Sequence, residues 1–372
     1  MVKGAPTFHP RVVLVTGGSG FIGSNLVRWL LQHTDVQAVV NLDALTYASN
    51  SESLSRVNTA HGHEGDGRYF FVRGDIRDRT LVGSLLAGTA REQATNRSIP
   101  AADAILHLAA ESHVDRSILG PETFVATNVQ GTLNLLECVR AELEARPRDF
   151  RFVNVSTDEV YGSLAADDSP FSERHPLRPN SPYSASKAGA DCLVRAYTET
   201  FGLPCVTTRC SNNYGPYQFP EKLIPLMITR ALSDQSLPVY GDGCNVRDWL
   251  YVTDHAAALW AVCTRGRVED EVYNIGGEAE RPNIDVVRAL LEILGKPESL
   301  ITYVSDRLGH DRRYAMDIGR ISSTVGWRPS VTFAEGLRRT VKWYLSNELW
   351  WRRVQSEAYR VSRELYLASA MT

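Results

Sequence analysis

The sequence predicts a doubly wound, parallel α/β sheet of the Rossmann type, with a smaller substrate-binding lobe toward the C-terminus. A β-branched run over residues 12–15 leads into a glycine-rich turn and then into a helical pattern over residues 24–32. Short apolar runs then alternate with helix-length segments to about residue 209, as in sheets whose strands are joined by crossover helices. Beyond that point, prolines, turns and short strands become more frequent.

The expected elements follow in order along the chain. Runs rich in β-branched and aromatic residues predict the strands. They cover residues 11–16, 38–42, 69–72, 104–108, 152–155 and 205–209, and later 237–240 and 272–275. Helical apolar spacing predicts helices over residues 24–32, 81–86, 127–145, 188–201, 285–294 and 333–345, and a helical tail that packs onto the body over residues 346–372. We expect a polar loop at residues 60–67 and a polar surface insertion at residues 89–100.

The turn after the first strand predicts a dinucleotide site. Gly17, Gly20 and Gly23 let the backbone approach a pyrophosphate, which can bind at the N-terminus of the following helix. Such spacing also occurs in ordinary turns, and its place directly after a first strand makes the signal strong. Asp43 ends the second predicted strand, about 20 residues after the last glycine of the turn. At this position a carboxylate binds a ribose 2′-OH and repels a 2′-phosphate. This favours NAD over NADP, with a plain turn or helix cap as the alternative for Asp43.

Five residues in one window suggest catalysis. Thr157, Asp158 and Glu159 come where the fifth strand runs out, at the sheet edge where ligands bind. Tyr183 and Lys187 lie four residues apart, which puts both on one helix face. A lysine ammonium beside a tyrosine favours the phenolate, so we expect the pKa of Tyr183 to lie below its reference value of about 10. Tyr183 could then act as a base. Taken alone, the Tyr–Lys pair would favour a solvated helix face, and the five chemically suited residues together favour catalysis.

Composition and charge exclude several classes of protein. The chain has 372 residues, of which 43% are hydrophobic and 22% charged, and its net charge is -3. This charge gives no general attraction to nucleic acid or to an anionic membrane. No apolar run reaches the length of a membrane span, and residues 1–10 lack the apolar core of a secretory signal. The six cysteines form no Cys-x-x-Cys pair and the histidines show no metal spacing, so we expect a cytoplasmic protein with free thiols and no metal.

We therefore divide the chain into three parts. Residues 1–209 are expected to form the NAD-binding domain that carries the catalytic residues. Residues 210–345 form mainly the substrate-binding lobe, interleaved with the first domain, and residues 346–372 form the tail.

The motifs resemble those of the extended short-chain dehydrogenase/reductase family. The general resemblance rests on Thr16-Gly17-Gly18-Ser19-Gly20-Phe21-Ile22-Gly23 and on Tyr183-x-x-x-Lys187. Within the family, the chain is most similar to the nucleotide-sugar 4,6-dehydratases, through residues 110–117, 156–162, 209–216, 247–249 and 306–311. The Thr157-Asp158-Glu159 triplet is the specific part, because related 4-epimerases and decarboxylases generally lack the adjacent carboxylates. Leu308 stands where the family has a proline.

The resemblance implies an activity and a role for each catalytic residue. The expected enzyme binds NAD tightly, regenerates it in each turnover and converts dTDP-glucose to the 4-keto-6-deoxy sugar. Tyr183 would take the proton of the sugar 4-OH, with Lys187 lowering its pKa and Thr157 hydrogen-bonded to the same hydroxyl. Glu159 would take the C5 proton, and a neutral Asp158 would protonate the leaving C6 hydroxyl. Neighbouring carboxyl groups with separate roles have their pKa values pushed apart.

Further residues are expected around the two ligands. For the cofactor they are Phe21, Ile22, Ala44, Leu45, Thr46, Asp75, Ile76, Leu108, Ala109, Ala110, Ser112, Thr127 and Asn213. For the nucleotide sugar they are Ser112, Thr157, Asn212, Lys222, Leu223, Pro238, Tyr240, Arg247, Asn283, Arg307 and His310. Arginine suits bidentate contact with a diphosphate, and a surface ion pair is the alternative for any one of these cations. We interpret His113, Asp115 and Arg116 as a capped helix start without a catalytic role.

The resemblance also implies a partner, and three other functions stay open. Helices around residues 132–143 and 188–201 would pair two copies through a four-helix bundle into a homodimer. A UDP-glucose 4,6-dehydratase would differ only in recognising uracil, and one methyl group is worth about 1–3 kcal/mol in a pocket. A 4-epimerase is disfavoured by the adjacent carboxylates. A catalytically silent NAD-binding scaffold is disfavoured because it has no physical need for all five catalytic residues.

Overall fold

A seven-stranded parallel sheet forms the centre of the molecule. The computed structural model describes residues 7–306 and 310–356. The strand order is β10-β6-β5-β4-β1-β2-β3, and every pairing in this sheet is parallel. The strands are β1 (Val12–Thr16), β2 (Ala38–Asp43), β3 (Tyr69–Arg73), β4 (Ala104–His107), β5 (Arg151–Thr157), β6 (Cys205–Cys210) and β10 (Val272–Ile275). The predicted Rossmann-type sheet is therefore confirmed, because each predicted strand in it forms.

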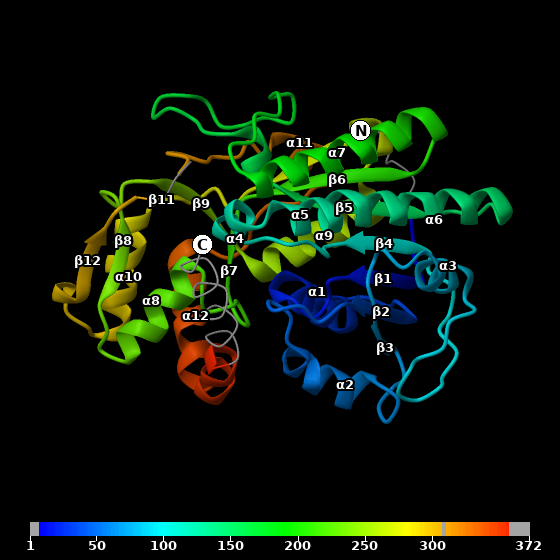
Figure 1. Ribbon diagram of the computed structural model, residues 1–372, viewed down its shortest axis with the longest axis horizontal. Coiled ribbons are helices and arrows are strands. Elements are labelled where there is room, and N and C mark those ends of the chain that lie inside the picture. The colour runs from blue at the N-terminus through cyan, green and yellow to red at the C-terminus, as the bar shows by residue number, and fades with distance from the viewer. Residues whose placement is uncertain (1–6, 307–309, 357–372) are drawn as a thin grey trace.

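Helices cover both faces of this sheet (Figure 1). One face packs against α1 (Phe21–His33), α2 (Ser55–His61), α9 (Val252–Arg265) and α11 (Gly319–Thr324). The other packs against α3 (Arg79–Ala87), α6 (Thr132–Ala145) and α7 (Pro182–Phe201). Between β4 and α6 the chain forms α4 (Val114–Leu119), α5 (Pro121–Phe124) and the π-helix η2 (Val125–Gly131). Short 3-10 helices, η1 (Ser51–Leu54) and η3 (Asp158–Tyr161), follow β2 and β5. The two apolar faces of the strands, alternating along each strand, create these two cores.

The lobe has a hydrophobic core of its own beside the carboxyl edge of the sheet (Figure 1). It contains a three-stranded sheet of β7 (Asn212–Tyr214), β9 (Val246–Tyr251) and β11 (Glu280–Pro282). A parallel pair, β8 (Leu237–Tyr240) and β12 (Ile301–Val304), lies farther out. The helices are α8 (Leu223–Leu232), α10 (Asn283–Leu294) and α12 (Phe333–Ser346), with the short η4 (Val268–Asp270) and η5 (Glu298–Leu300).

The chain passes between the two parts more than once. After building part of the lobe, it returns through α9 to the large sheet, where β10 pairs with β6. Both elements follow residue 209, so the large sheet draws on the second half of the chain. The division of the chain at residue 209 stays a prediction.

The insertion at residues 89–100 lies largely at the surface, as predicted, and it also anchors to the edge of β3. Glu92 is buried and accepts a hydrogen bond from the Phe71 amide (3.1 Å). Arg97 pairs with Glu92 at 2.9 Å and donates to the Tyr69 carbonyl at 2.8 Å. Gln93 exchanges hydrogen bonds with the backbone of Arg73. The segment thus satisfies polar groups of an edge strand that would otherwise be open to pairing.

Helices α2, α8 and α9 were not predicted, and the tail is described only in part. Residues 348–356 are helical, and Trp351 is buried with its indole N–H donating to the Tyr344 carbonyl (3.1 Å). The rest of the predicted tail lies outside the described residues. Among helices of the described ranges, none combines the length and the apolar character that a bilayer span requires.

Candidate active site

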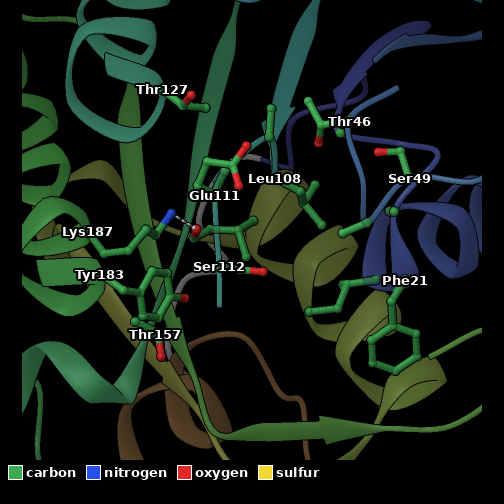
Figure 2. A pocket seen from close by; sticks show the side chains of 18 of the residues that line it. Phe21, Thr46, Ser49, Leu108, Glu111, Ser112, Thr127, Thr157, Tyr183 and Lys187 are labelled. Carbon is green, nitrogen blue, oxygen red and sulfur yellow. Dashed lines mark hydrogen bonds between the residues drawn. The ribbon is translucent and has the colours of Figure 1, made fainter. Parts of the chain in front are cut away.

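A cavity of about 610 Å³ opens at the carboxyl ends of β1, β2, β4, β5 and β6. All five predicted catalytic residues line it, and Figure 2 shows Thr157, Tyr183 and Lys187 together at one end of the group of side chains. Thr46 and Ser49 lie toward the other end, near Phe21. A cavity of this size and position can hold a dinucleotide, or part of a nucleotide sugar. The sheet edge, and not the lobe alone, therefore forms the centre of the site.

The glycine turn gives the backbone a shape that side chains would block. Gly17 has φ +72°, and a Cβ there would lie 2.8 Å from Ala109 Cα. A Cβ on Gly23 would lie 2.1 Å from the Gly17 carbonyl oxygen, so only glycine lets α1 begin this close to β1. A Cβ on Gly20 would meet only the Gly17 oxygen, at 3.3 Å. All three line the cavity, which fits a pyrophosphate bound against the turn and the start of α1.

Asp43 is held in place by backbone donors. Its Oδ2 accepts from the Ser19 amide and its Oδ1 from the Leu45 amide, both at 2.8 Å. Burial raises the pKa of this carboxyl, and the two hydrogen bonds oppose that rise. Asp43 lines the cavity, where a lone pair can accept from a ribose hydroxyl. Leu45 was predicted to contact the cofactor, but it does not line the cavity, and its amide instead orients Asp43.

The other predicted cofactor residues gather in the same cavity. The lining residues include Phe21, Ile22, Ala44, Thr46, Asp75, Ile76, Leu108, Ala109, Ala110, Ser112, Thr127 and Asn213. They come from the ends of four strands, from η2 and from the start of the lobe. Parallel strands bring their carboxyl ends to one edge, which explains why residues so far apart in sequence meet here.

The predicted acid–base pair, Asp158 and Glu159, begins η3 directly after β5. The Thr157 hydroxyl caps this helix by accepting from the Glu159 amide (3.3 Å), and it donates to Asp158 Oδ1 (3.2 Å). Asp158 is 2% exposed, and its Oδ2 has no hydrogen-bond partner among the described residues. Burial, followed by the charge of Glu159, raises the pKa of Asp158 well above its usual value. A neutral carboxyl that can donate a proton is therefore favoured at this position.

Tyr183 and Lys187 lie in the first two turns of α7. Ser181 and Ser184 form a capping box that starts this helix. The Lys187 ammonium donates to the Val155 carbonyl at 2.7 Å (Figure 2). Burial raises the pKa of Tyr183 well above 10, and the charge of Glu159 adds to the rise. The predicted lowering of this pKa by Lys187 is therefore wrong for this structure, because the ammonium is directed at a backbone carbonyl of β5.

The predicted substrate residues fall into two groups. Ser112, Thr157, Asn212 and Lys222 line the cavity, and Lys222 reaches back to the Ser112 carbonyl (3.4 Å). The remaining described members lie on the lobe outside the cavity lining; they are Leu223, Pro238, Tyr240, Arg247, Asn283 and His310. Arg307, like Leu308, lies outside the described residues.

Two members of the lobe group have partners that hold them in place. Arg247 is buried, donates to the Asp311 carbonyl at 2.8 Å and lies over the Tyr314 ring. Its charge opposes the raised pKa of Asp158, which places it near the acid–base pair. His310 pairs with Asp306 at 2.6 Å and lies edge-on to the ring of Tyr240.

Several lining residues were not predicted. They include Ser49, Cys210, Gln218, Phe219 and Glu221. Glu221 precedes the predicted Lys222 and Ser49 follows the predicted Thr46 by three residues, so extending each predicted loop would have found them. Cys210 gave no local signal, because its contact with the Ser156 carbonyl (3.4 Å) depends on the pairing of β5 with β6.

The predicted helix start at His113 is confirmed. Its ring nitrogen accepts from the Arg116 amide (3.5 Å), and the Arg116 guanidinium lies 3.6 Å from the centre of the Tyr47 ring.

Among the described residues, no cluster of three or more histidine, cysteine or acidic side chains is placed to hold a metal ion.

Comparisons with known proteins agree with this geometry. Residues 14–340 match the GDP-mannose 4,6 dehydratase family. The chain is 52% identical to the dTDP-glucose 4,6-dehydratase of Neisseria meningitidis serogroup B over 95% of its own length and 98% of that protein. It is 50% identical to dTDP-glucose 4,6-dehydratase 1 of Escherichia coli K12, over 94% and 96% of the two chains.

Solved structures include relatives of two activities. DesIV, a dTDP-glucose 4,6-dehydratase from Streptomyces venezuelae solved with NAD bound, is 48% identical with a TM-score of 0.83, over 92% of this chain and 99% of that one. A UDP-glucose 4-epimerase from Thermotoga maritima is 27% identical with a TM-score of 0.77, over 91% and 99%. The chain therefore belongs to the GDP-mannose 4,6 dehydratase family, of the extended short-chain dehydrogenase/reductase type that its motifs predict, and its curated relatives there are dTDP-glucose 4,6-dehydratases.

Proposed function

We propose that this protein is an NAD-dependent dTDP-glucose 4,6-dehydratase. The observation that carries the proposal is the buried Asp158 beside Glu159, in the same cavity as Tyr183 and Lys187. An oxidation or epimerisation at C4 needs only the tyrosine and lysine. A carboxyl favoured in its neutral form, next to a second carboxylate, supports an added elimination step that needs one acid and one base.

The glycine turn, Asp43 and the cavity between them fit NAD. The turn leaves room for the pyrophosphate, and the carboxylate favours a ribose without a 2′-phosphate. When bound, NAD⁺ accepts the hydride from C4 of the sugar, later returns it to C6 and favours the phenolate of a tyrosine in the same cavity. Because the cofactor ends each turnover as it began, we expect the protein to retain it during purification.

The residues of this chain would move the protons. Tyr183 takes the proton of the 4-OH while C4 gives up its hydride, which together make C4 a ketone and the C5 proton acidic. Glu159 removes the C5 proton, the C6–O bond breaks, and the leaving hydroxyl takes the proton of Asp158 and departs as water. Glu159 then returns its proton to C5 as C6 is reduced, giving the 4-keto-6-deoxy sugar and one water. Before the next turnover Tyr183 would lose that proton to solvent, and Asp158 would regain from solvent the proton that it gives to the leaving water. Thr157 orients Asp158 through their hydrogen bond and would also hydrogen-bond the 4-OH of the sugar.

The lobe would bind the nucleotide diphosphate. Arg247 and Lys222 supply positive charge, with Asn212 at the border between the lobe and the cavity. We propose that the lobe, at residues 210–345, contributes mainly to substrate binding and that the first 209 residues hold the cofactor and the catalytic groups. The six free cysteines support a cytoplasmic location.

We also propose a homodimer formed through α6 and α7. Five exposed apolar residues lie on or near these helices, at Ile118, Leu119, Val125, Leu133 and Phe201. Pairing α6 and α7 of two copies would form a four-helix bundle and bury this surface. Light scattering on a size-exclusion column should give about twice the mass of 41.3 kDa, and Leu133→Glu should shift it toward the mass of one chain.

The deciding experiment offers the purified protein dTDP-glucose and, separately, UDP-glucose, without added NAD⁺. The 4-keto-6-deoxy product is followed by its absorbance in base and by mass. Product from dTDP-glucose alone supports the reaction, the base preference and the retained cofactor together. Product from UDP-glucose alone would assign the other base, and a product epimerised at C4, or none even with NAD⁺ supplied, would refute the dehydratase. Tyr183→Phe serves as the inactive control.

A further inference from the structure

A buried polar cluster lies behind the active site, outside the cavity. It consists of Tyr161, Asp191 and Arg209, here called the Arg209 cluster. The Arg209 guanidinium donates to Asp191 Oδ2 and to the Tyr161 hydroxyl, both at 2.9 Å. Asp191 Oδ1 also accepts from Asn154 (3.0 Å), and the Tyr161 hydroxyl donates to Asn274 (2.8 Å). The side chains of Arg209 and Asp191 are only 7% and 2% exposed, so the pair is strongly shielded from solvent.

Each member of the Arg209 cluster stands on an element that carries part of the site. Tyr161 is the last residue of η3, the short helix that begins with Asp158 and Glu159. Asp191 lies one turn after Lys187 on α7. Arg209 precedes Cys210, which lines the cavity at the end of β6. The cluster therefore ties together the three elements that hold the two pairs of catalytic groups.

The Tyr161 side chain is fixed from three sides. Its ring stacks on Phe171 with centroids 4.9 Å apart, and the Arg209 guanidinium lies 4.8 Å from its centroid. Its hydroxyl both donates and accepts a hydrogen bond, to partners on β10 and β6. Buried networks in which every member has partners hold their geometry tightly, because each lost hydrogen bond leaves a polar group without solvent.

We infer that the Arg209 cluster keeps the elimination pair, Asp158 and Glu159, in register with the oxidation pair, Tyr183 and Lys187. The Tyr161 hydroxyl is then a positioning group for the elimination step, although it touches neither sugar nor cofactor. The inference rests on the proposed function. A dehydratase must act at C4 and then at C5 and C6 of one bound sugar, so the two pairs must keep a fixed separation. A displacement of about 1 Å can slow a reaction about 100-fold.

Tyr161→Phe tests the inference, since it removes only the hydroxyl and keeps the stacked ring. Tyr273→Phe is the matched control. Tyr273 is also buried, donates to Asp270 (2.7 Å) and accepts from the Arg267 amide (2.9 Å), but these partners lie on or next to η4, which carries none of the predicted catalytic residues. Both variants therefore lose one donated and one accepted hydrogen bond, and we expect similar decreases in thermal midpoint.

The two variants should differ in the catalytic steps. For Tyr161→Phe we expect kcat to fall about 10- to 100-fold with KM changed less than about threefold. Elimination should slow more than C4 oxidation, so the near-ultraviolet absorbance of reduced nicotinamide should build up during turnover. Incorporation of solvent deuterium at C5 should slow as well. Tyr273→Phe should show the wild-type kcat and no build-up.

Three results would overturn the inference. The first is a Tyr161→Phe enzyme that turns over like Tyr273→Phe. The second is an equal slowing of oxidation and elimination without build-up of reduced nicotinamide, which would mark a general structural role. The third is a wild-type protein that converts neither sugar nucleotide, which refutes the proposed function and this inference with it. Conversion by the wild type and by Tyr273→Phe would keep the proposed function whatever the outcome for Tyr161→Phe.

Discussion

Replacing Gly23 with alanine should weaken cofactor binding, because the added methyl group has no room. A Cβ at this position would lie 2.1 Å from the Gly17 carbonyl oxygen and 2.7 Å from Gly18 Cα. Both are backbone atoms, so no side chain can rotate away. Since a Cβ essentially never comes within 3.0 Å of such an atom, α1 and the glycine turn must separate by at least 0.9 Å, the difference between 3.0 and 2.1 Å.

The energetic cost follows from this displacement. Overpacking of a close-packed site costs about 1–3 kcal/mol. If the strain falls on the cofactor site, that corresponds to about a 5- to 150-fold loss of NAD affinity. If it falls on the fold, the free energy of unfolding drops by the same amount. The start of α1, where the pyrophosphate is expected, is the part that must move.

The assay compares Gly23→Ala with the wild type and with Gly83→Ala. Gly83 lies inside α3, where a Cβ would meet no atom within 4 Å. Alanine there should stabilise the fold by about 0.4–1 kcal/mol and leave the cofactor site unchanged. The nucleotide released from each purified protein is measured by absorbance, the dissociation constant for NAD by calorimetry, and the thermal midpoint with and without NAD.

A Gly23→Ala protein that keeps NAD at wild-type affinity, with an unchanged thermal midpoint, would refute the reasoning. It would mean that the turn can separate from α1 without cost and does not form the pyrophosphate site. A lower thermal midpoint with wild-type affinity would confine the strain to the packing of α1 on β1.

Three further predictions test the acid–base pair and the insertion. Burial raises the pKa of Asp158, so its carboxyl group holds a proton more tightly in the folded state than in the unfolded state. The free energy of unfolding of the wild type therefore decreases as the pH rises above about 3.9, the pKa of an aspartate in the unfolded chain. The thermal midpoint of Asp158→Asn should therefore lie above that of the wild type at about pH 8, and the difference should shrink toward about pH 4. In the same variant, elimination should slow about 100- to 10,000-fold. Equal thermal midpoints of variant and wild type at both pH values would contradict the buried neutral carboxyl. Glu159→Gln should block exchange of the C5 proton with solvent and still allow C4 oxidation, and rapid deuterium incorporation at C5 by NMR would remove Glu159 as the base. Arg97→Met removes the cationic partner of the buried Glu92 and should lower the free energy of unfolding, measured in urea, by about 3–5 kcal/mol without lowering kcat. A decrease below about 1 kcal/mol would show that this ion pair does not anchor the insertion.

The sheet could be predicted because its signals are local. The runs that form β1, β2 and β5 consist of apolar and β-branched residues, bounded by glycine or polar residues. The predicted Asp43 and the Thr157-Asp158-Glu159 triplet follow directly from where such runs end. Parallel strands then bring those ends together whatever the intervening chain does.

The missed helices and the insertion show the limits of local patterns. Helix α9 is buried on most sides, with ten buried residues out of 14, so it lacks the polar face that makes a surface helix recognisable. The insertion at residues 89–100 has no periodicity, because its order comes from Glu92 and Arg97 bonding to β3. Their partners, Phe71 and Tyr69, lie 21 and 28 residues away in the sequence, outside any local window.

The sequence by itself determined the fold class, the glycine-rich turn and the five candidate catalytic residues that line one cavity, because these depend on residue type and spacing within single elements. Only the tertiary structure accounts for the direction of the pKa shifts in the site. The pKa of Asp158 and Tyr183 rises mainly because distant elements bury them, and the Lys187 ammonium donates to the Val155 carbonyl of β5. The contacts of Arg209 with α7 and η3 likewise join residues 18 and 48 positions apart. Burial and electrostatic interactions depend on the whole packed molecule, which no stretch of sequence contains.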